Sequence, residues 1–524
     1  MNLEDALKRI AILEQENKAL QVENKALQVE NEEQRLLIFK QQQKLNELLK
    51  DKEIVREKLI IEQVKPFVAK SEKINEIIIN EPEAVLQENK QTKARVGRKK
   101  GGKNFANVDL ESAVVDTVYE EPDSLVCPTC SNDLTLASQK ERYIIEVIPS
   151  TIKVTKVIKR SYKCKHDQKF VYPLSQEVFP GSVLTPSFAA YIAYHKYELG
   201  IPFHHLEKHL TNVLNVPISK QLMATWMQTL AEKLTPVYNA MKRDLLNNSV
   251  KVIHADETTL SIAKRPENAV NRKKSYVYVY ASSYFDQQIH LYDFHESRSI
   301  DLTAKWLEKY DGYIVCDDYA GYTKLAKNNP AIKLQRCFAH ARRRFSDILK
   351  ALPASEVKTT LSYKILTLIN ELFAYEAKYK TDAVLPSEIC AKRHHDQIPL
   401  LNELKAYIFD TPLSPNSALE GAVKYVRKIW DELLTYLDYP YLEISNNLAE
   451  RAVKPFVINR KVFMTAGSYA GAKYTTVIFS VIRTALINHL NIEKYLIYLL
   501  ENLDKQPLDD ILPYAPKLPN ELKV

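Results

Sequence analysis

The sequence has few cysteines and no long apolar run, and both shortages exclude classes of protein. Six cysteines in 524 residues are too few for a disulfide framework, so we expect a reducing cytoplasm rather than a secreted, disulfide-rich protein. The first ten residues, MNLEDALKRI, are charged and no apolar core follows them, so no signal peptide is expected. The most apolar late stretch, 477–487, is interrupted by Arg483 and is too short for a transmembrane helix. We therefore expect no membrane partner.

The charge balance is only mildly basic. Lys and Arg number 73 against 65 Asp and Glu, which gives a net charge of +8. Such a surplus permits a polyanionic partner without indicating one. The length allows two to four domains, so the clustering of charges is more informative than their sum.

Residues 1–64 carry a heptad pattern. Asn17, Asn24 and Asn31 occupy the same heptad position, Leu13, Leu20 and Leu27 occupy another, and KALQVEN occurs twice in succession. Asparagine at a core position selects register and a two-stranded state. We predict a coiled coil that makes a homodimer or larger assembly, with a lone amphipathic helix as the alternative.

A linker with a basic segment follows at 65–123. Seven basic residues and no acid lie between Lys90 and Lys103. A flexible basic arm of this kind can neutralise DNA phosphates, and a solvated linker is the alternative. The candidate contacts within it are Arg95, Arg98, Lys99 and Lys100.

The segment 124–175 begins with a CxxC pair, Cys127 and Cys130, and continues to Cys164 and His166. Two thiolates at this spacing can hold one side of a tetrahedral Zn²⁺. His166 is the softer fourth ligand and Asp167 has the better spacing. We predict a small zinc-ribbon-like module, with a ribbon that has lost its metal as the alternative.

Residues 181–246 have helical periodicity over 185–198, 203–213 and 219–246. Short helices joined in this way are typical of a helix-turn-helix-like DNA reader. A bundle that only supports the next domain fits the pattern equally well.

From 247 the pattern changes to strands. Three β-rich runs at 250–262, 274–283 and 288–297 are followed by a helix, a buried strand GYIVCDD and a second helix. This order predicts a ribonuclease-H-like α/β core, with its first part at 247–349. An α-helical insertion (350–440), a second core part (441–490) and a C-terminal element (491–524) complete a multidomain α+β chain.

Two aspartates lie at positions where a ribonuclease-H-like core could bring them together. Asp256 lies in the first strand and Asp317 ends the fourth, and these strands are neighbours in a ribonuclease-H-like sheet. Buried carboxylates repel one another unless a proton or a cation bridges them, and Mg²⁺, or Mn²⁺ in its place, takes oxygen ligands. Glu257 should point to the opposite face, and Asp318 is the second choice to Asp317.

A third acid, Glu450, lies in LEISNNLAERAVKPFVINRK (442–461). We predict a helix capped near Ser445 or Asn446, with Pro455 ending or kinking it. Three acids brought together can hold two ions for phosphodiester chemistry, whereas the plain alternative is an exposed helix with a Glu–Lys pair. The basic residues around Glu450, which are candidate DNA contacts, are Arg451, Lys454, Arg460 and Lys461.

The segment CFAHARRRF (337–345) places Cys337 three residues before His340. One such pair supplies at most half of a metal shell, and we favour a role for His340 in bracing the core or a phosphate. The arginines that follow are predicted contacts with the DNA backbone: Arg342, Arg343 and Arg344.

These motifs together resemble the IS66-type transposases, which are DDE recombinases of bacterial insertion sequences. HADET (254–258), CDDYAGY (316–322) and NNLAERAVKPFVINRK (446–461) are similar to the family's two aspartate motifs and its glutamate motif. The resemblance selects Asp317 over Asp318, and it implies a catalytic triad of Asp256, Asp317 and Glu450 with two Mg²⁺ ions. The family's zinc-ribbon-like module usually closes with a second CxxC pair. This sequence has only Cys164, followed by His166, at that place, which departs from the family pattern.

The resemblance implies an enzyme that binds the ends of an insertion sequence, cuts them, and joins the 3′-hydroxyls to target DNA. Its expected partners are double-stranded DNA and small accessory proteins, in a bacterial cytoplasm and associated with the nucleoid. Two alternatives stay open: an inactive DNA-binding derivative, and a ribonuclease-H-like nuclease that hydrolyses without joining.

Overall fold

The computed structural model describes residues 152–163, 170–171, 177–266, 274–282, 288–413, 415 and 417–524. Contacts between residues divide the chain into two units, one with 177–203 and 221–524, the other with 204–220 and the described part of 89–176. Several predictions lie outside the described residues: the coiled coil, the basic linker with Arg95, Arg98, Lys99 and Lys100, and the proposed zinc ligands Cys127, Cys130, Cys164 and His166.

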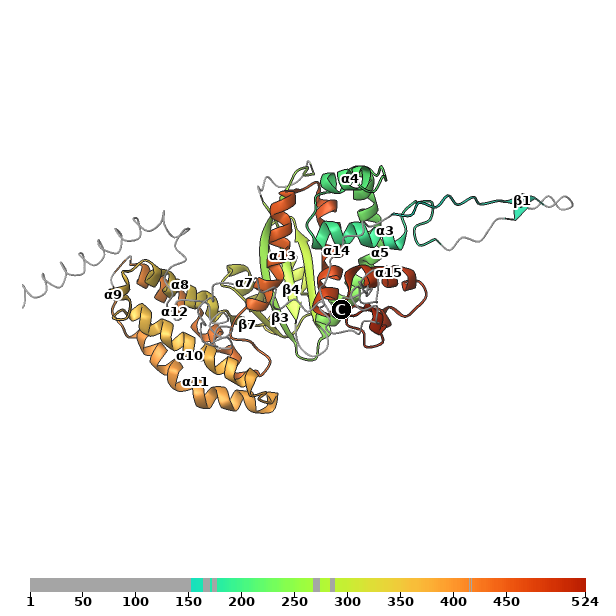
Figure 1. The fold of residues 1–524 in the computed structure, drawn as a ribbon. Coiled ribbons are helices and arrows are strands. Elements are labelled where there is room, and N and C mark those ends of the chain that lie inside the picture. Colours follow the sequence, from blue (N-terminus) through green and yellow to red (C-terminus); the bar gives the residue numbers. More distant parts are fainter. Residues whose placement is uncertain are drawn as a thin grey trace, which may run out of the picture. The chain divides into compact units, whose positions relative to one another are not determined.

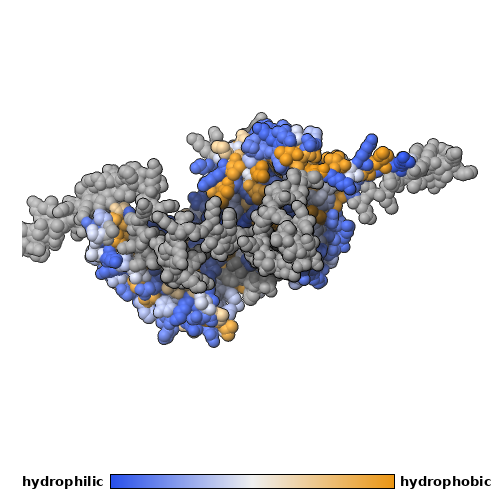
Figure 2. All heavy atoms as spheres, viewed as in Figure 1, coloured by the Kyte–Doolittle hydropathy of each residue, from blue (hydrophilic) through white to orange (hydrophobic). Residues whose placement is uncertain are grey.

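The second unit contains little regular structure in its described part. β1 (Tyr162–Lys163) pairs antiparallel with β2 (Phe170–Val171), and most of α4 (Phe203–Asn212) belongs to this unit. Residues 152–161 have no regular secondary structure, and hydrophobic side chains are exposed along them, Val154 and Val157 among them (Figure 2).

The first unit is built around one mixed sheet with the order β5-β4-β3-β6-β7. Strands β3 (Val252–Ile262), β4 (Ser275–Ser282) and β5 (Ile289–His295) form an antiparallel meander. β6 (Tyr313–Cys316) and β7 (Lys333–Arg336) run parallel to β3, and the short β8 (Thr465–Ala466) pairs with its end. The predicted adjacency of the first and fourth strands is therefore confirmed.

Helices cover both faces of this sheet, which explains why side chains on both faces of β4 and β5 are buried. α13 (Asn447–Phe463) and α14 (Tyr469–Ile487) pack on one face (Figure 1). The other face receives α6 (Ile300–Trp306), where Trp306 stacks on Tyr280 of β4, and α7 (Ala320–Asn328).

Hydroxyl groups of α14 protect the open edge of β5. Ser480 Oγ accepts a hydrogen bond from the Tyr292 amide at 2.8 Å, and Thr484 Oγ1 accepts one from the His290 amide at 3.2 Å. An edge strand otherwise presents unpaired amides that invite other strands. The apolar late stretch thus belongs to a core helix, and within the described residues every helix is too short or too polar to cross a bilayer.

The predicted helices at 185–198, 203–213 and 219–246 are confirmed. Thr185 caps α3 (Pro186–Ala193) by accepting from the Phe188 amide, and the helix continues as the π-helix η2 (Tyr194–Glu198). α5 (Lys220–Asn247) is the longest helix described. That these helices bind DNA as a helix-turn-helix-like reader stays a prediction.

The predicted helical insertion is also confirmed. It comprises α9 (Ala354–Val357), α10 (Leu361–Thr381), α11 (Pro386–Phe409), α12 (Ala418–Leu433) and the 3₁₀-helix η3 (Thr435–Asp438). Figure 1 shows these helices packed beside α8 (Phe338–Lys350). One apolar core joins them to Val252 of β3 and Val315 of β6, so the insertion is anchored at the strands that carry the aspartates.

The chain ends in a short helical element. α15 (Ile492–Asn502) packs on α3, and the 3₁₀-helices η4 (Leu508–Asp510) and η5 (Asn520–Leu522) follow it. The Tyr495 hydroxyl donates to the Ile511 carbonyl at 2.9 Å, which fixes the last residues against α15.

A buried arginine holds α11 against the connection that leads to α13. Arg393, 3% exposed, donates to both oxygens of Glu376 at 2.9 and 2.7 Å and to the carbonyls of Tyr436 and Leu442. Its removal leaves the Glu376 charge buried without its cation, which is far more costly than losing a surface pair.

We expect Arg393→Leu to lower the free energy of unfolding by about 3–5 kcal/mol, measured by urea denaturation followed by circular dichroism. Lys392→Leu is the matched control, since Lys392 is the exposed neighbour on the same helix, and should change stability by no more than about 0.5 kcal/mol. Equal losses in the two variants would contradict this role for Arg393.

Candidate functional site

Asp256 and Asp317 lie on the same face of the sheet. Side chains alternate along a strand, so Asp256 shares its face with His254, and His254 pairs in register with Val315 of β6. Asp317 follows Val315 by two residues, just beyond the end of β6. The structure therefore brings together the two aspartates that the sequence singled out, on the face that α13 covers.

A tight turn positions the Asp317 carboxylate. Its Oδ1 accepts from the Tyr319 amide at 3.0 Å. The buried guanidinium of Arg336 donates to the Asp317 carbonyl and, through Nε, to Glu432 of α12 at 2.5 Å. The sequence did not reveal this role of Arg336, because the residues next to it do not show that its side chain reaches the end of the neighbouring strand.

Asn446 joins the start of α13 to the strand that carries Asp256. Its Nδ2 donates to the Ala255 carbonyl at 2.8 Å, and its own amide donates to Cys337 Sγ at 3.1 Å. Asn446 occupies the predicted N-cap position, but its side chain makes no capping hydrogen bond. The polar group that would cap the helix instead ties it to β3, which places Glu450 in the first turn beside the sheet.

The other end of α13 is also fixed to β3. Arg460 donates to Thr258 Oγ1 at 2.9 Å and to Thr259 Oγ1 at 3.0 Å. Pro455 lies inside the helix, which continues to Phe463, so it does not end α13. Packing on the sheet outweighs the single backbone hydrogen bond that proline removes.

The three acids act on one another electrostatically. Burial raises the pKa of the Asp256 carboxyl to about 8, the charge of Glu257 adds to the rise, and Asp317 and Glu450 raise it further. Asp256 Oδ1 accepts from the Glu257 amide at 2.8 Å. At neutral pH this carboxyl therefore keeps its proton unless a cation replaces it.

The neighbouring acids have partners of their own. Glu257 points to the opposite face, as predicted, where the Arg298 Nε donates to it at 2.8 Å and the Tyr322 hydroxyl lies at 3.5 Å. Asp318 pairs with the Lys428 ammonium of α12 at 2.7 Å. Their charges are balanced locally, which leaves Asp256 and Asp317 as the pair facing α13.

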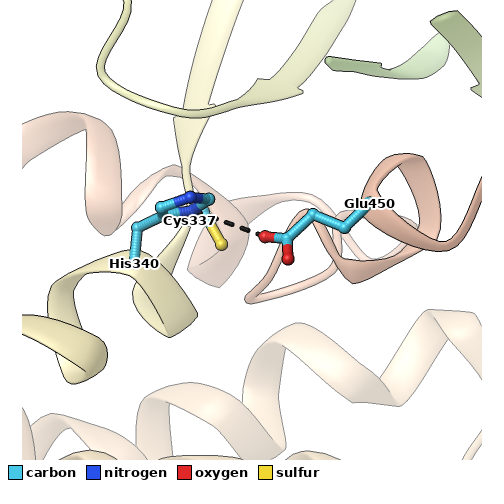
Figure 3. A group of neighbouring side chains, drawn as sticks. All are labelled: Cys337, His340 and Glu450. Atoms are coloured by element: carbon cyan, nitrogen blue, oxygen red, sulfur yellow. Dashed lines mark ion pairs between the residues drawn. The ribbon is translucent and has the colours of Figure 1, made fainter. Parts of the chain in front are cut away.

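Glu450 also faces a second set of groups. Its carboxylate, the Cys337 thiol and the His340 ring offer ligand atoms that all lie within 4.8 Å of one another (Figure 3). His340 Nδ1 is 3.5 Å from Glu450 Oε1, and Arg343 approaches Oε2 at 3.6 Å. The sequence spacing revealed only Cys337 and His340, because Glu450 comes more than a hundred residues later.

A family model, that of the transposase IS66 family, matches residues 181–474, which is more than half of the chain. The chain belongs to this family. Membership implies a transposase, with DNA as its partner and, as is typical of DDE transposases, a need for divalent metal ions. Asp256, Asp317 and Glu450 all lie within the matched residues.

Three similar proteins of Sinorhizobium fredii carry the name of uncharacterized proteins. Protein y4jD is 24% identical over 78% of this chain and 80% of its own length. Protein y4qI is 27% identical over 66% of this chain and 64% of its own, and y4hP is 23% identical over 76% and 74%.

The basic residues of this IS66-family chain divide into exposed and buried ones. Arg342 is 4% exposed and its Nε donates to Asn370 of α10 at 2.7 Å, so we leave it out of the proposed DNA contacts. Arg460 serves the α13–β3 contact described above. The exposed ones are Arg343, Arg344, Arg451, Lys454 and Lys461. The Arg344 guanidinium lies over the Tyr425 ring.

The raised pKa of Asp256 predicts a pH-dependent stability in the absence of divalent ions. Between its ordinary value of 3.8 and the folded value of about 8, the folded chain keeps a proton that the unfolded chain has released. The free energy of unfolding therefore falls as pH rises through this window, by at most about 1.4 kcal/mol per pH unit.

We expect the unfolding midpoint of the wild type in EDTA to drop more steeply from pH 6 to 8.5 than that of Asp256→Asn, measured by thermal denaturation. Asp318→Asn is the control and should keep the wild-type slope, since its carboxylate is balanced by Lys428. An unchanged slope in Asp256→Asn would show that another group titrates.

Proposed function

We propose that this chain is a DDE transposase that binds the ends of its insertion sequence, cuts them in a Mg²⁺-dependent reaction and transfers the freed 3′-hydroxyls to target DNA. The observation that carries the proposal is that Asp256 and Asp317 share the face of the sheet that α13 covers, and that α13 carries Glu450 in its first turn. The strand order, with an antiparallel meander followed by two parallel strands, supports a ribonuclease-H-like core.

The donor set fits divalent ions that prefer oxygen ligands. Burial is the main cause of the raised pKa of Asp256, and the charges of Glu257, Asp317 and Glu450 add to it. Glu450 Oε1 is buried without a hydrogen-bond partner among the described residues. When bound, two Mg²⁺ ions, or Mn²⁺ in their place, would activate the attacking oxygen and stabilise the leaving one. Asp256, Asp317 and Glu450 are the residues that would hold these ions.

The proposed reaction has two steps, cleavage and joining, and the Asp256 carboxyl would have to be ionised for the site to hold its ions. In cleavage, water attacks the end phosphodiester and the bond to the 3′-oxygen breaks. In joining, that 3′-hydroxyl attacks a target phosphodiester in line, so one P–O bond forms as another breaks and no covalent enzyme intermediate is needed.

The exposed basic residues of α13 and α8 give the site a surface for phosphates. Lys454 and Lys461 are exposed on the helix that carries Glu450, and Arg344 is exposed on α8. We further propose that the coiled coil at 1–64 pairs two chains, and that the basic linker at 65–123, the zinc-ribbon-like module at 124–175 and the helices at 181–246 hold the transposon ends.

We expect Asp256→Asn, Asp317→Asn and Glu450→Gln each to abolish cleavage and strand transfer of end DNA while leaving end binding intact, because each removes a metal ligand without changing shape. Products on labelled end DNA are measured on gels with Mg²⁺, and binding by mobility shift. Glu257→Gln is the control, because its carboxylate faces Arg298 on the other side of the sheet.

Three outcomes separate the candidate functions. Cleavage with strand-transfer products supports the transposase. Cleavage without joining points to a nuclease, and end binding without cleavage in the wild type points to an inactive DNA-binding derivative. Retained cleavage in Asp256→Asn rules out the assigned acids.

The salt dependence of the affinity for DNA should also reflect the positive charges of α13. We expect Lys454→Ala and Lys461→Ala each to lower the slope of log affinity against log salt by about 1, since each ammonium neutralises about one phosphate. Fluorescence anisotropy with end DNA at several salt concentrations measures the slope. Lys494→Ala, an exposed lysine of α15, should leave it unchanged; an effect equal to that of Lys454→Ala would place the DNA elsewhere.

A further inference from the structure

The group formed by Cys337, His340 and Glu450 has the dimensions of a metal site of a different chemical class from the acidic site. Cys337 precedes the first turn of α8, His340 lies within that turn, and Glu450 lies in the first turn of α13. Figure 3 shows the three side chains pointing toward one another. Their ligand atoms lie within 4.8 Å of one another.

The separation of the ligand atoms suits a tetrahedral ion. Bond lengths of about 2.0 Å to nitrogen or oxygen and 2.3 Å to sulfur put neighbouring ligands of Zn²⁺ about 3.3 Å apart, or about 3.5 Å when one of them is sulfur. His340 Nδ1 and Glu450 Oε1 are already 3.5 Å apart. Since all three ligand atoms lie within 4.8 Å of one another, Cys337 Sγ has to approach the other two by at most about 1.3 Å.

Two polar atoms of this group lack a hydrogen-bond partner among the described residues. His340 Nδ1 and Glu450 Oε1 are both buried and make no hydrogen bond within the part of the chain that the structure describes. Buried polar atoms are normally paired. A cation between them gives both a partner at once, whereas a structural brace would be expected to have a good hydrogen bond already.

Backbone amides lie around the Cys337 sulfur. Burial and the Glu450 carboxylate raise the pKa of the thiol to about 12, so the thiol is neutral until a cation displaces its proton, although the amides of Asn446, His340 and Ala339 lower this pKa. The Asn446 amide donates to Sγ at 3.1 Å. Amides at the start of a helix stabilise a thiolate, so the protein supplies the hydrogen bonds that a metal-bound sulfur needs.

We propose that Cys337, His340 and Glu450 bind a thiophilic divalent cation of the Zn²⁺ class, with water in the fourth position. Sulfur and imidazole select Zn²⁺ over Mg²⁺, which takes oxygen ligands. The second half of the proposal rests on the proposed function: an ion here occupies the Glu450 carboxylate that the Mg²⁺ site needs, so Zn²⁺ inhibits the Mg²⁺-dependent reaction.

The binding test uses Co²⁺ as a spectroscopic substitute for Zn²⁺ on the full chain carrying Cys127→Ser and Cys130→Ser, which removes the other predicted thiolate site. We expect one Co²⁺ per chain with a thiolate-to-cobalt charge-transfer band, displaced by Zn²⁺. Adding Cys337→Ser should abolish the band, and adding His340→Gln should weaken Co²⁺ binding by about tenfold or more.

Cys390→Ser is the matched control, because Cys390 lies on α11 and outside the group, and it should keep the band. Circular dichroism verifies that each variant is folded, and His340→Gln gives an independent test should Cys337→Ser not fold. A band that survives Cys337→Ser, or no band while Cys337 is present, overturns the site.

The inhibition test measures Mg²⁺-dependent cleavage with and without micromolar Zn²⁺, and each variant is compared with its own Zn²⁺-free rate. We expect Zn²⁺ to inhibit the Cys127→Ser, Cys130→Ser chain about tenfold or more, and His340→Gln to lose most of that inhibition. Bound Co²⁺ with no inhibition by Zn²⁺ overturns the link to Glu450. A chain that binds Co²⁺ but never cleaves DNA overturns the proposed function and leaves the binding site standing.

Discussion

The attachment of α13 to β3 is the constraint on which the candidate site depends. Asn446 binds the Ala255 carbonyl at one end of the helix, and Arg460 binds Thr258 and Thr259 at the other. Two contacts along one strand fix both the position and the rotation of the helix, so Glu450 can face only the side of the sheet that carries Asp256. These contacts join β3 to a helix that begins nearly two hundred residues later in the chain.

Electrostatics explains why so many acids are tolerated in one place. Glu257 is balanced by Arg298 on the far face and Asp318 by Lys428 on α12, while Asp256 stays protonated because burial and its acidic neighbours raise its pKa. The fold thus places a cation beside each of the two other acids, Glu257 and Asp318. A divalent cation would likewise offset the charges around Asp256.

The helical insertion connects the two halves of the core as well as interrupting them. Apolar residues of α8, α10, α11 and α12 pack with Val252 of β3 and Val315 of β6 in one core, and Arg336 links Glu432 of α12 to the Asp317 turn. The insertion therefore contributes to the geometry of the acidic residues. Cys337 and His340, at the start of the neighbouring helix α8, bring sulfur and imidazole groups close to Glu450.

The sequence by itself determined the strands, most helices and the adjacency of β3 and β6, since alternation and pattern spacing act over a few residues. It placed Glu257 on the opposite face for the same reason. It did not determine that Pro455 lies inside α13, that Asn446 binds Ala255 rather than capping its helix, that Arg342 is buried against Asn370, or that Cys337 and His340 meet Glu450. Those were decided by the tertiary structure, because each depends on packing between segments far apart in the chain, where the energy of burial and of paired polar groups outweighs local preference.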